Sequence, residues 1–406
     1  MGQQDKRDDL AREVGLIPLI FYGTGTILGA GIFVVIGEVL GEAGGLSPLA
    51  YLMAAVVAIT TALSYSEMAA RFPTAGGPID YVERAFGRRW LGSWTGWALM
   101  TANVVSAATI TTGFVAYMSS FIDVTPWVAT IAFLGAIIAV SAVGMKESAW
   151  LMTATTLIGM GTLLFVLWVL RDGLLASPSE IANSITDFDG AMAPALFGAA
   201  FLAIYSFIGF GDMAQTAEEV RDVKRVMPQA MLLSLAIVFV FYLAISMALV
   251  GAGDLEELVD AEAPLVRAVG REGWQVMPVA IASLAVIANS ALTQLIASAR
   301  LLYDIGRDKR GAPQILGKVN ARTKTPVLAT LIIGAIILVL ALFVPLKQLA
   351  TITSYAILLV FAGVNASLIV MKKRSQPEDV PDIWPAVPVV GVAVCVAALI
   401  GQVAMG

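Results

Sequence analysis

The 406-residue chain contains no histidine and only one cysteine, Cys395. The absence of histidine excludes a Ser-His-Asp triad, a histidine-ligated metal and the usual proton switch near neutral pH. One cysteine excludes a disulfide framework and a cysteine-based metal cluster. We therefore expect no bound cofactor and no metal centre of either kind. Only carboxylate or hydroxyl groups remain for catalytic chemistry.

Charge is also scarce in this chain. Only 14% of the residues are charged, whereas ordinary soluble domains carry about 25%. Apolar residues make up 58%, and the mean hydropathy is +0.84. This composition predicts an all-α protein that crosses the lipid bilayer many times, without a nucleic-acid partner. Residues 1–13 form a short, charged segment that lacks a signal-peptide cleavage site, so we expect a cytoplasmic tail.

Long apolar segments dominate the rest of the chain. About 20 apolar residues are enough to cross a bilayer as a helix. On that rule the sequence predicts eleven spans, at residues 14–40, 46–70, 90–122, 125–144, 147–170, 192–219, 227–252, 274–303, 326–344, 347–371 and 384–405.

The distribution of Lys and Arg predicts how these spans are oriented. Positive residues are retained on the cytoplasmic side of a membrane. With the N-terminus inside, 21 of the 25 Lys and Arg residues fall in cytoplasmic connections. We therefore expect a multi-pass protein of the cell membrane with a cytoplasmic N-terminus and, after eleven spans, a C-terminus outside.

Glycines interrupt two of the segments at matching places. Gly23, Gly25, Gly29 and Gly31 lie in the first segment, and Gly209 and Gly211 in the sixth. Glycine weakens a helix by roughly 1 kcal/mol relative to alanine. Non-helical backbone at membrane depth is tolerated where it is buried or lines a cavity. The alternative is that small residues allow tight helix packing.

Paired interrupted helices are typical of transporters built from an inverted repeat. The sequence divides accordingly into five-helix repeats at residues 14–170 and 192–371, joined by an outer connection at 171–191. A cytoplasmic loop at 372–383 then leads to a peripheral eleventh helix at 384–406.

Broken helices expose backbone groups that can bind an amino acid. A half-helix N-terminus suits a carboxylate, and free carbonyls suit an ammonium group. Gly29 and Gly209 would flank the breaks in the first and sixth segments. We expect the carboxylate at the amides of Ala30, Gly31 and Ile32, and the amino group at carbonyls near Ile27, Tyr205 and Ile208.

Five motifs in order resemble the amino acid-polyamine-organocation transporter superfamily. They are Thr26–Phe33, Ser64–Gly77, Ala85–Gly87 with Gly96-Trp97, Phe207–Phe210 with Glu218-Glu219, and Ser298–Tyr303 with Asn320 and Pro326. The resemblance implies a five-plus-five inverted repeat with discontinuous helices 1 and 6 and a substrate between helices 1, 3, 6, 8 and 10. Most members have twelve spans, whereas this chain has about eleven, and its oligomeric state is undetermined.

Several side chains are candidates for this site. Relatives cover the substrate with aromatic residues where this chain has Tyr205 and Phe207, although ordinary packing is the alternative. Asn103 has helical spacing with Ser106 and Thr109, whose hydroxyls could instead bond their own helix. Asp212 is the acid expected near mid-membrane, as a proton site or a counter-ion, although relatives carry such an acid at the position of Gly211.

The coupling ion is left open by the sequence. Some proton-coupled relatives use a lysine in the fifth helix, where this chain has Thr156 instead. Sodium favours oxygen ligands, and carbonyls near Gly25 and Leu28 with Asn289 and Ser290 could supply them. Sodium coupling, proton coupling and ion-independent exchange all remain compatible with these residues.

The function predicted is alternating-access transport of an amino acid, best fitted by a small or neutral one. One alternative is transport of a cationic amino acid or amine that Asp212 recognises, either alone or by exchange. Another alternative is an amino acid sensor. An enzyme is not expected. Gly31→Val is expected to abolish substrate binding without unfolding the protein. Glu67 is expected to form a structural contact with basic residues.

Overall fold

The computed structural model describes residues 14–143, 149–253, 255–270, 273–308, 310–320, 325–375, 377 and 379–405. Over these ranges the chain is helical, and the only β-type pairing is an isolated bridge between Val14 and Val220. The predicted tail at residues 1–13 lies outside the described residues, as does the side chain of Ala30.

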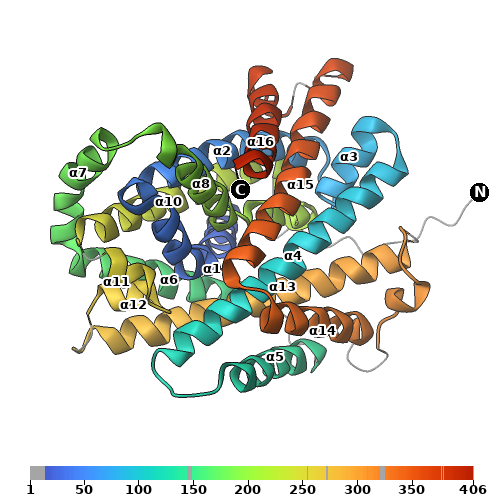
Figure 1. Cartoon of the computed structure of the whole chain (residues 1–406). Helices are drawn as coiled ribbons and strands as arrows, with labels where there is room; N and C mark the ends of the chain where they lie inside the picture. The colour runs from blue at the N-terminus through green and yellow to red at the C-terminus, as the bar shows by residue number, and fades with distance from the viewer. Residues whose placement is uncertain are drawn as a thin grey trace, which may run out of the picture.

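All eleven expected segments coincide with helices (Figure 1). Eight stretches are long and apolar enough to cross a membrane, one of them containing both α1 and α2, and α5 and α14 are shorter apolar helices. The helices are α1 (Leu16–Ala43), α2 (Ser47–Arg71), α4 (Arg89–Ser119), α5 (Pro126–Val143), α6 (Ala149–Val169), α8 (Ala193–Ser206) with α9 (Phe210–Gln215), α10 (Val223–Gly251), α13 (Val276–Arg307), α14 (Val327–Phe343), α15 (Leu346–Arg374) and α16 (Ala386–Met405).

Shorter helices occupy several of the connections. The expected outer connection forms α7 (Arg171–Thr186), and α11 (Leu255–Val259) and α12 (Pro264–Ala268) follow α10. α3 (Pro78–Phe86) begins at a proline and ends at Gly87, whose φ of 64° is left-handed. Proline at the first turn and glycine after the last are the usual boundaries of a short helix.

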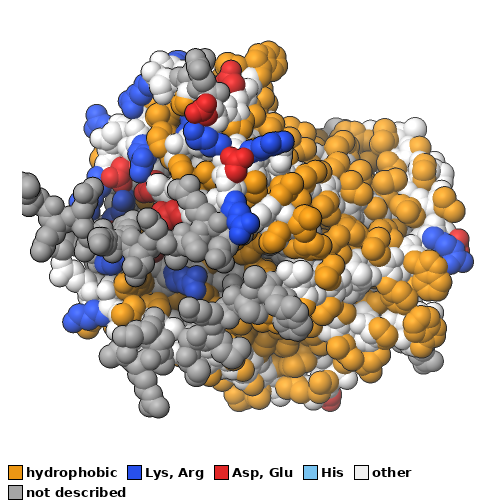
Figure 2. Space-filling view, turned by 180° about the vertical axis from the view of Figure 1, so that it is seen from behind, with side chains coloured by type: hydrophobic (Ala, Val, Ile, Leu, Met, Phe, Trp, Pro, Cys, Tyr) orange, Lys and Arg blue, Asp and Glu red, His pale blue; other side chains and the backbone are white. Residues whose placement is uncertain are grey.

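The surface of the helix bundle is strongly apolar. Val240, Ile281, Val339 and Ile400 are 63, 60, 56 and 64% exposed, and each lies within an apolar helix. Figure 2 shows a broad apolar surface, with most of the visible charged side chains gathered toward one end. Such a surface is matched by hydrocarbon chains and not by water, so the protein is a multi-pass membrane protein.

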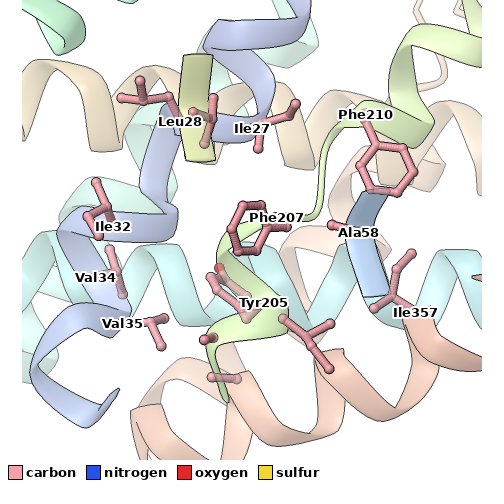
Figure 3. Packing of buried hydrophobic residues seen from close by; sticks show 14 of the residues in the cluster. Ile27, Leu28, Ile32, Val34, Val35, Ala58, Tyr205, Phe207, Phe210 and Ile357 are labelled. Carbon is pink, nitrogen blue, oxygen red and sulfur yellow. The ribbon is translucent and has the colours of Figure 1, made fainter. Parts of the chain in front are cut away.

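The sixth predicted segment is broken, as expected. α8 ends at Ser206 and α9 begins at Phe210, and Gly209 between them has a φ of 130°. Figure 3 shows the chain leaving the helix after Phe207 and re-entering it at Phe210. Only glycine adopts this backbone conformation without strain, so the second glycine pair marks a true interruption.

The first segment differs from the expectation. α1 is one helix from Leu16 to Ala43, so the discontinuity predicted for helix 1 is absent from this structure. Its glycines serve close packing instead: a Cβ at Gly23, Gly29 or Gly31 would lie 2.4, 2.4 or 2.8 Å from Met213, Ser290 or Ser206. Close packing against these neighbours outweighs the low helix propensity of glycine.

This continuity also corrects the proposed carboxylate clamp. The amides of Ala30, Gly31 and Ile32 lie in the interior of α1, where helical amides donate to carbonyls four residues earlier. In addition, a Cβ at Gly31 would meet the backbone of Ser206. Gly31→Val would therefore push two helices apart, and the expectation that it leaves the fold intact is wrong.

A buried ion-pair network joins the ends of α2 and α15. Glu67 is fully buried and accepts hydrogen bonds from Arg71 Nε at 2.9 Å and from the Ile383 amide at 2.9 Å. Lys372 lies 2.9 Å from Glu67 and 2.6 Å from Asp382. The Lys372 hydrogen bond lowers the pKa of the Asp382 carboxyl. Glu67 thus makes the structural contact with basic residues that its position predicted.

Removing the Glu67 carboxylate should destabilise the protein. Glu67→Gln leaves Arg71 and Lys372, whose side chains are only 3 and 5% exposed, without their buried counter-charge. Loss of one partner from a buried pair costs about 3–5 kcal/mol. We expect a clearly lower thermal unfolding midpoint in detergent.

The matched control is Lys224→Ala. Lys224 pairs with Asp379 at 3.4 Å, and both side chains are exposed. Exposed pairs contribute about 0–1 kcal/mol. Equal midpoints for the two variants would contradict the assigned role of Glu67.

Candidate functional site

A small cavity of about 30 Å³ lies where α1, α4, α6, α13 and the α8–α9 connection meet. It brings together residues that are far apart in the sequence. Eight of the predicted site residues line it: Gly25, Ile27, Gly31, Tyr205, Ile208, Asp212, Asn289 and Ser290.

Other predicted binding residues lie away from this cavity. Phe207 is fully buried and packs against Tyr242, with the two ring centroids 5.2 Å apart. Figure 3 shows Phe207 at the end of α8, on the stretch where the helix gives way to the connection. Asn103 and Ile32 are buried outside the cavity lining, and Gly209 packs against the Thr26 backbone. Phe207 therefore packs in the protein core, which was the alternative to covering the substrate.

Tyr205 is held at the cavity by α4. Its hydroxyl lies 3.2 Å from the Ser106 hydroxyl, and both residues line the cavity. Thr109 instead donates to the carbonyl of Val105 in its own helix at 2.9 Å. Of the hydroxyls with helical spacing on α4, only Ser106 therefore reaches the site.

Most hydroxyl donors around the cavity are already committed to the protein. Thr26 donates to the Gly23 carbonyl at 3.0 Å, Ser290 to Val286 at 3.0 Å and Thr293 to Asn289 at 2.9 Å. A hydroxyl has one proton and two lone pairs, so these groups present acceptors to the cavity.

Asp212 adds a carboxylate to this lining, while none of the described residues that line the cavity is Lys or Arg. Asp212 also accepts a hydrogen bond from Gln215 at 3.4 Å. The cavity is therefore rich in hydrogen-bond acceptors and suits a ligand that carries N–H donors, such as an ammonium group.

Thr293, Gln294 and Tyr242 were not anticipated from the sequence. Thr293 and Gln294 line the cavity, and the Gln294 Oε1 atom is buried without a hydrogen-bond partner within the described part of the chain. Each lies four residues after Asn289 or Ser290, so the i, i+4 spacing on one helix could have identified them. Tyr242 lies in an otherwise apolar segment and carries no comparable signal.

A second, smaller cavity of about 10 Å³ gathers the predicted coupling-ion residues. Gly25, Leu28, Thr156, Asn289 and Ser290 all line it. The Thr156 hydroxyl lies 3.2 Å from the carbonyl of Phe21 on α1 and 2.7 Å from that of Met152. A Cβ at Gly25 would overlap the Thr156 hydroxyl, so this glycine allows α6 to approach α1.

A larger cavity of about 570 Å³ adjoins the central one. Both cavities are lined by Asp212 and Thr293, so the central cavity is next to this vestibule. The vestibule carries charges of both signs, including Arg84, Arg300, Arg307, Arg310, Asp80, Glu218, Glu219, Asp304 and Asp308.

Side-chain contacts join helices at the opposite end of the molecule, beside a separate cavity of about 470 Å³. Lys347 at the start of α15 forms an ion pair with Glu42 at the end of α1. Phe201 packs against Tyr355 with ring centroids 4.8 Å apart. The central cavity shares lining residues with the vestibule and none with the cavity at Glu42 and Lys347. Such one-sided access is typical of a transporter in one of its alternating states.

Comparison with solved structures gives the fold class. MhsT in complex with L-phenylalanine aligns with a TM-score of 0.64 at 14% identity, covering 97% of this chain and 98% of that one. A Na⁺-coupled sialic acid symporter aligns with a TM-score of 0.59 at 14% identity, covering 99% and 92%. The protein has the inverted-repeat fold of these transporters.

Sequence comparison gives the family. The family model described as amino acid permease matches residues 14–405. An uncharacterized transporter of Mycobacterium tuberculosis is 29% identical over 98% of this chain and 87% of its own length. The branched-chain amino acid permease BcaP of Bacillus subtilis is 26% identical (94% and 85%), and the vacuolar cationic amino acid transporter 4 of Arabidopsis thaliana is 26% identical (93% and 66%). The chain belongs to the amino acid permease family and is a transporter, not an enzyme.

Substitution by alanine should have different effects at the two glycines of the broken helix. Gly209→Ala places a Cβ 2.7 Å from the Thr26 carbonyl group at a φ of 130°. In Gly211→Ala the Cβ would make only ordinary contacts, at 3.5 Å or more, with the Tyr65 ring. We expect Gly209→Ala to lose most of its folded yield or transport, and Gly211→Ala to resemble wild type. Size-exclusion profiles and uptake assays measure both, and a benign Gly209→Ala would show that the junction tolerates a side chain.

Proposed function

We propose that this permease carries an amino acid across the cell membrane by alternating access, as a secondary active transporter. The observation that carries the proposal is the acceptor-rich cavity beside the break in helix 6, which adjoins the charged vestibule and shares no lining residue with the cavity at the opposite end. The hydroxyl oxygens and the Asp212 carboxylate that line the cavity suit the ammonium group that all amino acid substrates share.

The charge of the vestibule supports an orientation. Its rim carries four arginines, Arg84, Arg300, Arg307 and Arg310. Positive side chains are retained in the cytoplasm, so we assign this face to the cell interior. The structure then represents a state open to the cytoplasm, with the first helix beginning on that side.

The size of the cavity and the position of Asp212 favour different substrates. A cavity of about 30 Å³ favours a substrate with a small side chain. Asp212 lines the same cavity, where its carboxylate could recognise the positive charge of a cationic amino acid or an amine. The named relatives include both a branched-chain permease and a cationic amino acid transporter. We take a small or neutral amino acid as the leading candidate and a cationic one as the second.

Uptake of a panel of radiolabelled amino acids into proteoliposomes tests the function. We expect saturable uptake of at least one amino acid and counterflow when the vesicles are preloaded with it. Binding without counterflow would favour a sensor, and no response to any amino acid or amine would overturn the proposal.

Asp212→Asn separates the two substrate classes, because it removes the negative charge and keeps the shape. If the substrate is neutral, its KM should change little. If the substrate is cationic, its KM should rise by about tenfold or more, as expected for loss of a charge-assisted hydrogen bond of roughly 1.5–3 kcal/mol.

We further propose a small cation at the 10 Å³ cavity. The Thr156 and Ser290 hydroxyls donate to backbone carbonyls and leave lone pairs available, and both residues line this cavity. Neutral oxygen ligands without a carboxylate cluster suit a monovalent ion such as sodium better than a divalent one. Within the described residues, no group of His, Cys, Asp or Glu is arranged to hold a metal.

A sodium gradient should therefore stimulate uptake, and Ser290→Ala should weaken that stimulation. The control is Thr162→Val on α6, whose hydroxyl donates to its own helix at Ile158 and lies outside both cavities. Stimulation by a pH gradient alone would overturn the sodium site and favour Asp212 as a proton site. Indifference to both gradients would favour exchange.

A further inference from the structure

The break in helix 6 leaves the Ser206 carbonyl without its helical donor. In an uninterrupted helix the Phe210 amide would donate to Ser206. Here Ile208 donates to Tyr205 at 3.1 Å, and after the break Asp212 donates to Gly209 at 3.0 Å. In the described part of the chain no backbone amide is bonded to the Ser206 carbonyl across the break. A buried carbonyl in a membrane needs a partner from elsewhere.

That partner comes from α10. The Tyr242 hydroxyl lies 2.9 Å from the Ser206 carbonyl and 2.9 Å from the Ile27 carbonyl on α1. The phenol has a single proton, which it donates to one carbonyl at a time while remaining in contact with both. Tyr242 is fully buried, and its ring packs against Tyr51 and Phe207 at centroid distances of 5.7 and 5.2 Å.

The hydroxyl is located where the two helices touch through their backbones. A Cβ at Gly31 would lie 2.8 Å from the Ser206 backbone and 2.9 Å from the Tyr242 hydroxyl. The Thr26 hydroxyl adds a longer hydrogen bond of 3.4 Å to the Gly209 carbonyl between the same segments. Tyr242 therefore supplies a short polar link at this junction.

The central cavity depends on the same junction, because α1 contributes Ile27 and Gly31 to its lining and the end of helix 6 contributes Tyr205 and Ile208. A shift of one helix against the other would move the two halves of the lining apart. Tyr242 itself does not line the cavity, so its influence on a substrate is indirect.

We propose that Tyr242 is a positioning residue, which holds α1 and the broken helix 6 in the register that the substrate requires. It ties the carbonyl freed by the break to the neighbouring helix and thereby fixes the geometry of the acceptors in the cavity. The proposal rests on the proposed function of the cavity as the amino acid site.

The test is Tyr242→Phe, which removes the hydroxyl and keeps the ring. Uptake kinetics in proteoliposomes should show a KM raised about five- to tenfold, as for loss of one well-placed hydrogen bond, with a smaller change in kcat. Hydrogen–deuterium exchange without substrate should be faster in peptides that cover residues 200–215 and 20–34.

Two controls separate positioning from a general loss of packing. Tyr81→Phe removes a fully buried hydroxyl that has no partner within the described residues. Tyr117→Phe removes a hydroxyl that donates to α1 at Phe33, away from the junction. Both variants should keep the wild-type KM.

Each outcome decides the role of Tyr242. A variant with a lower unfolding midpoint but an unchanged KM and unchanged exchange would overturn the proposal and leave a purely structural residue. If wild-type vesicles take up no amino acid, the proposed function fails, while the exchange measurement still decides whether Tyr242 holds the junction. Should Tyr242→Phe not yield a monodisperse protein, Thr26→Val removes the hydrogen bond to the Gly209 carbonyl across the same junction, and unchanged exchange with an unchanged KM there would count against the proposal.

Discussion

Two stretches of backbone meet with almost no side chain between them where α1 crosses the broken helix formed by α8 and α9. Gly209 lies against Thr26, and Gly31 lies against Ser206. Contact this close is open only to glycine, and it brings carbonyl groups into a region without water. Those groups must be satisfied by the protein or by a ligand. The Tyr242 and Thr26 hydroxyls meet part of that demand, and the central cavity forms beside this contact.

The chemistry of the cavity follows from this arrangement. Its hydroxyl groups donate their protons to helix carbonyls, as Ser290 does to Val286, and turn their lone pairs inward. Asp212 adds negative charge from the first turn of α9. The result is an acceptor-lined space between the helices that adjoins a charged vestibule, while an ion pair between Glu42 and Lys347 joins α1 and α15 at the opposite end. A carrier of amino acids needs this asymmetry, because access from both sides at once would allow leakage.

Much of the fold could be predicted because its signals are local. An apolar run long enough to span a bilayer has to be a helix, since no other structure satisfies its backbone in lipid. The interruption at Gly209 was also visible, because glycine in mid-span is costly unless its conformation is used. The glycines of α1 carry the same local signal, yet they serve packing against Thr156, Ser290 and Ser206. Sequence alone could not separate the two uses, since the difference lies in what faces the glycine.

The sequence by itself determined that the protein is a helical membrane transporter, that its sixth span carries a glycine suited to an interruption at Gly209, and that Asp212, Asn289 and Ser290 are unusual polar residues within the spans. Only the tertiary structure decided that Tyr205 faces the cavity while Phe207 packs into the core, and that α1 stays intact. It also decided that Tyr242 reaches the freed carbonyl of Ser206. The physical reason is that the length of a span and the position of a break depend on residues nearby in the sequence. The direction of a side chain depends on the other helices that pack against it in the fold.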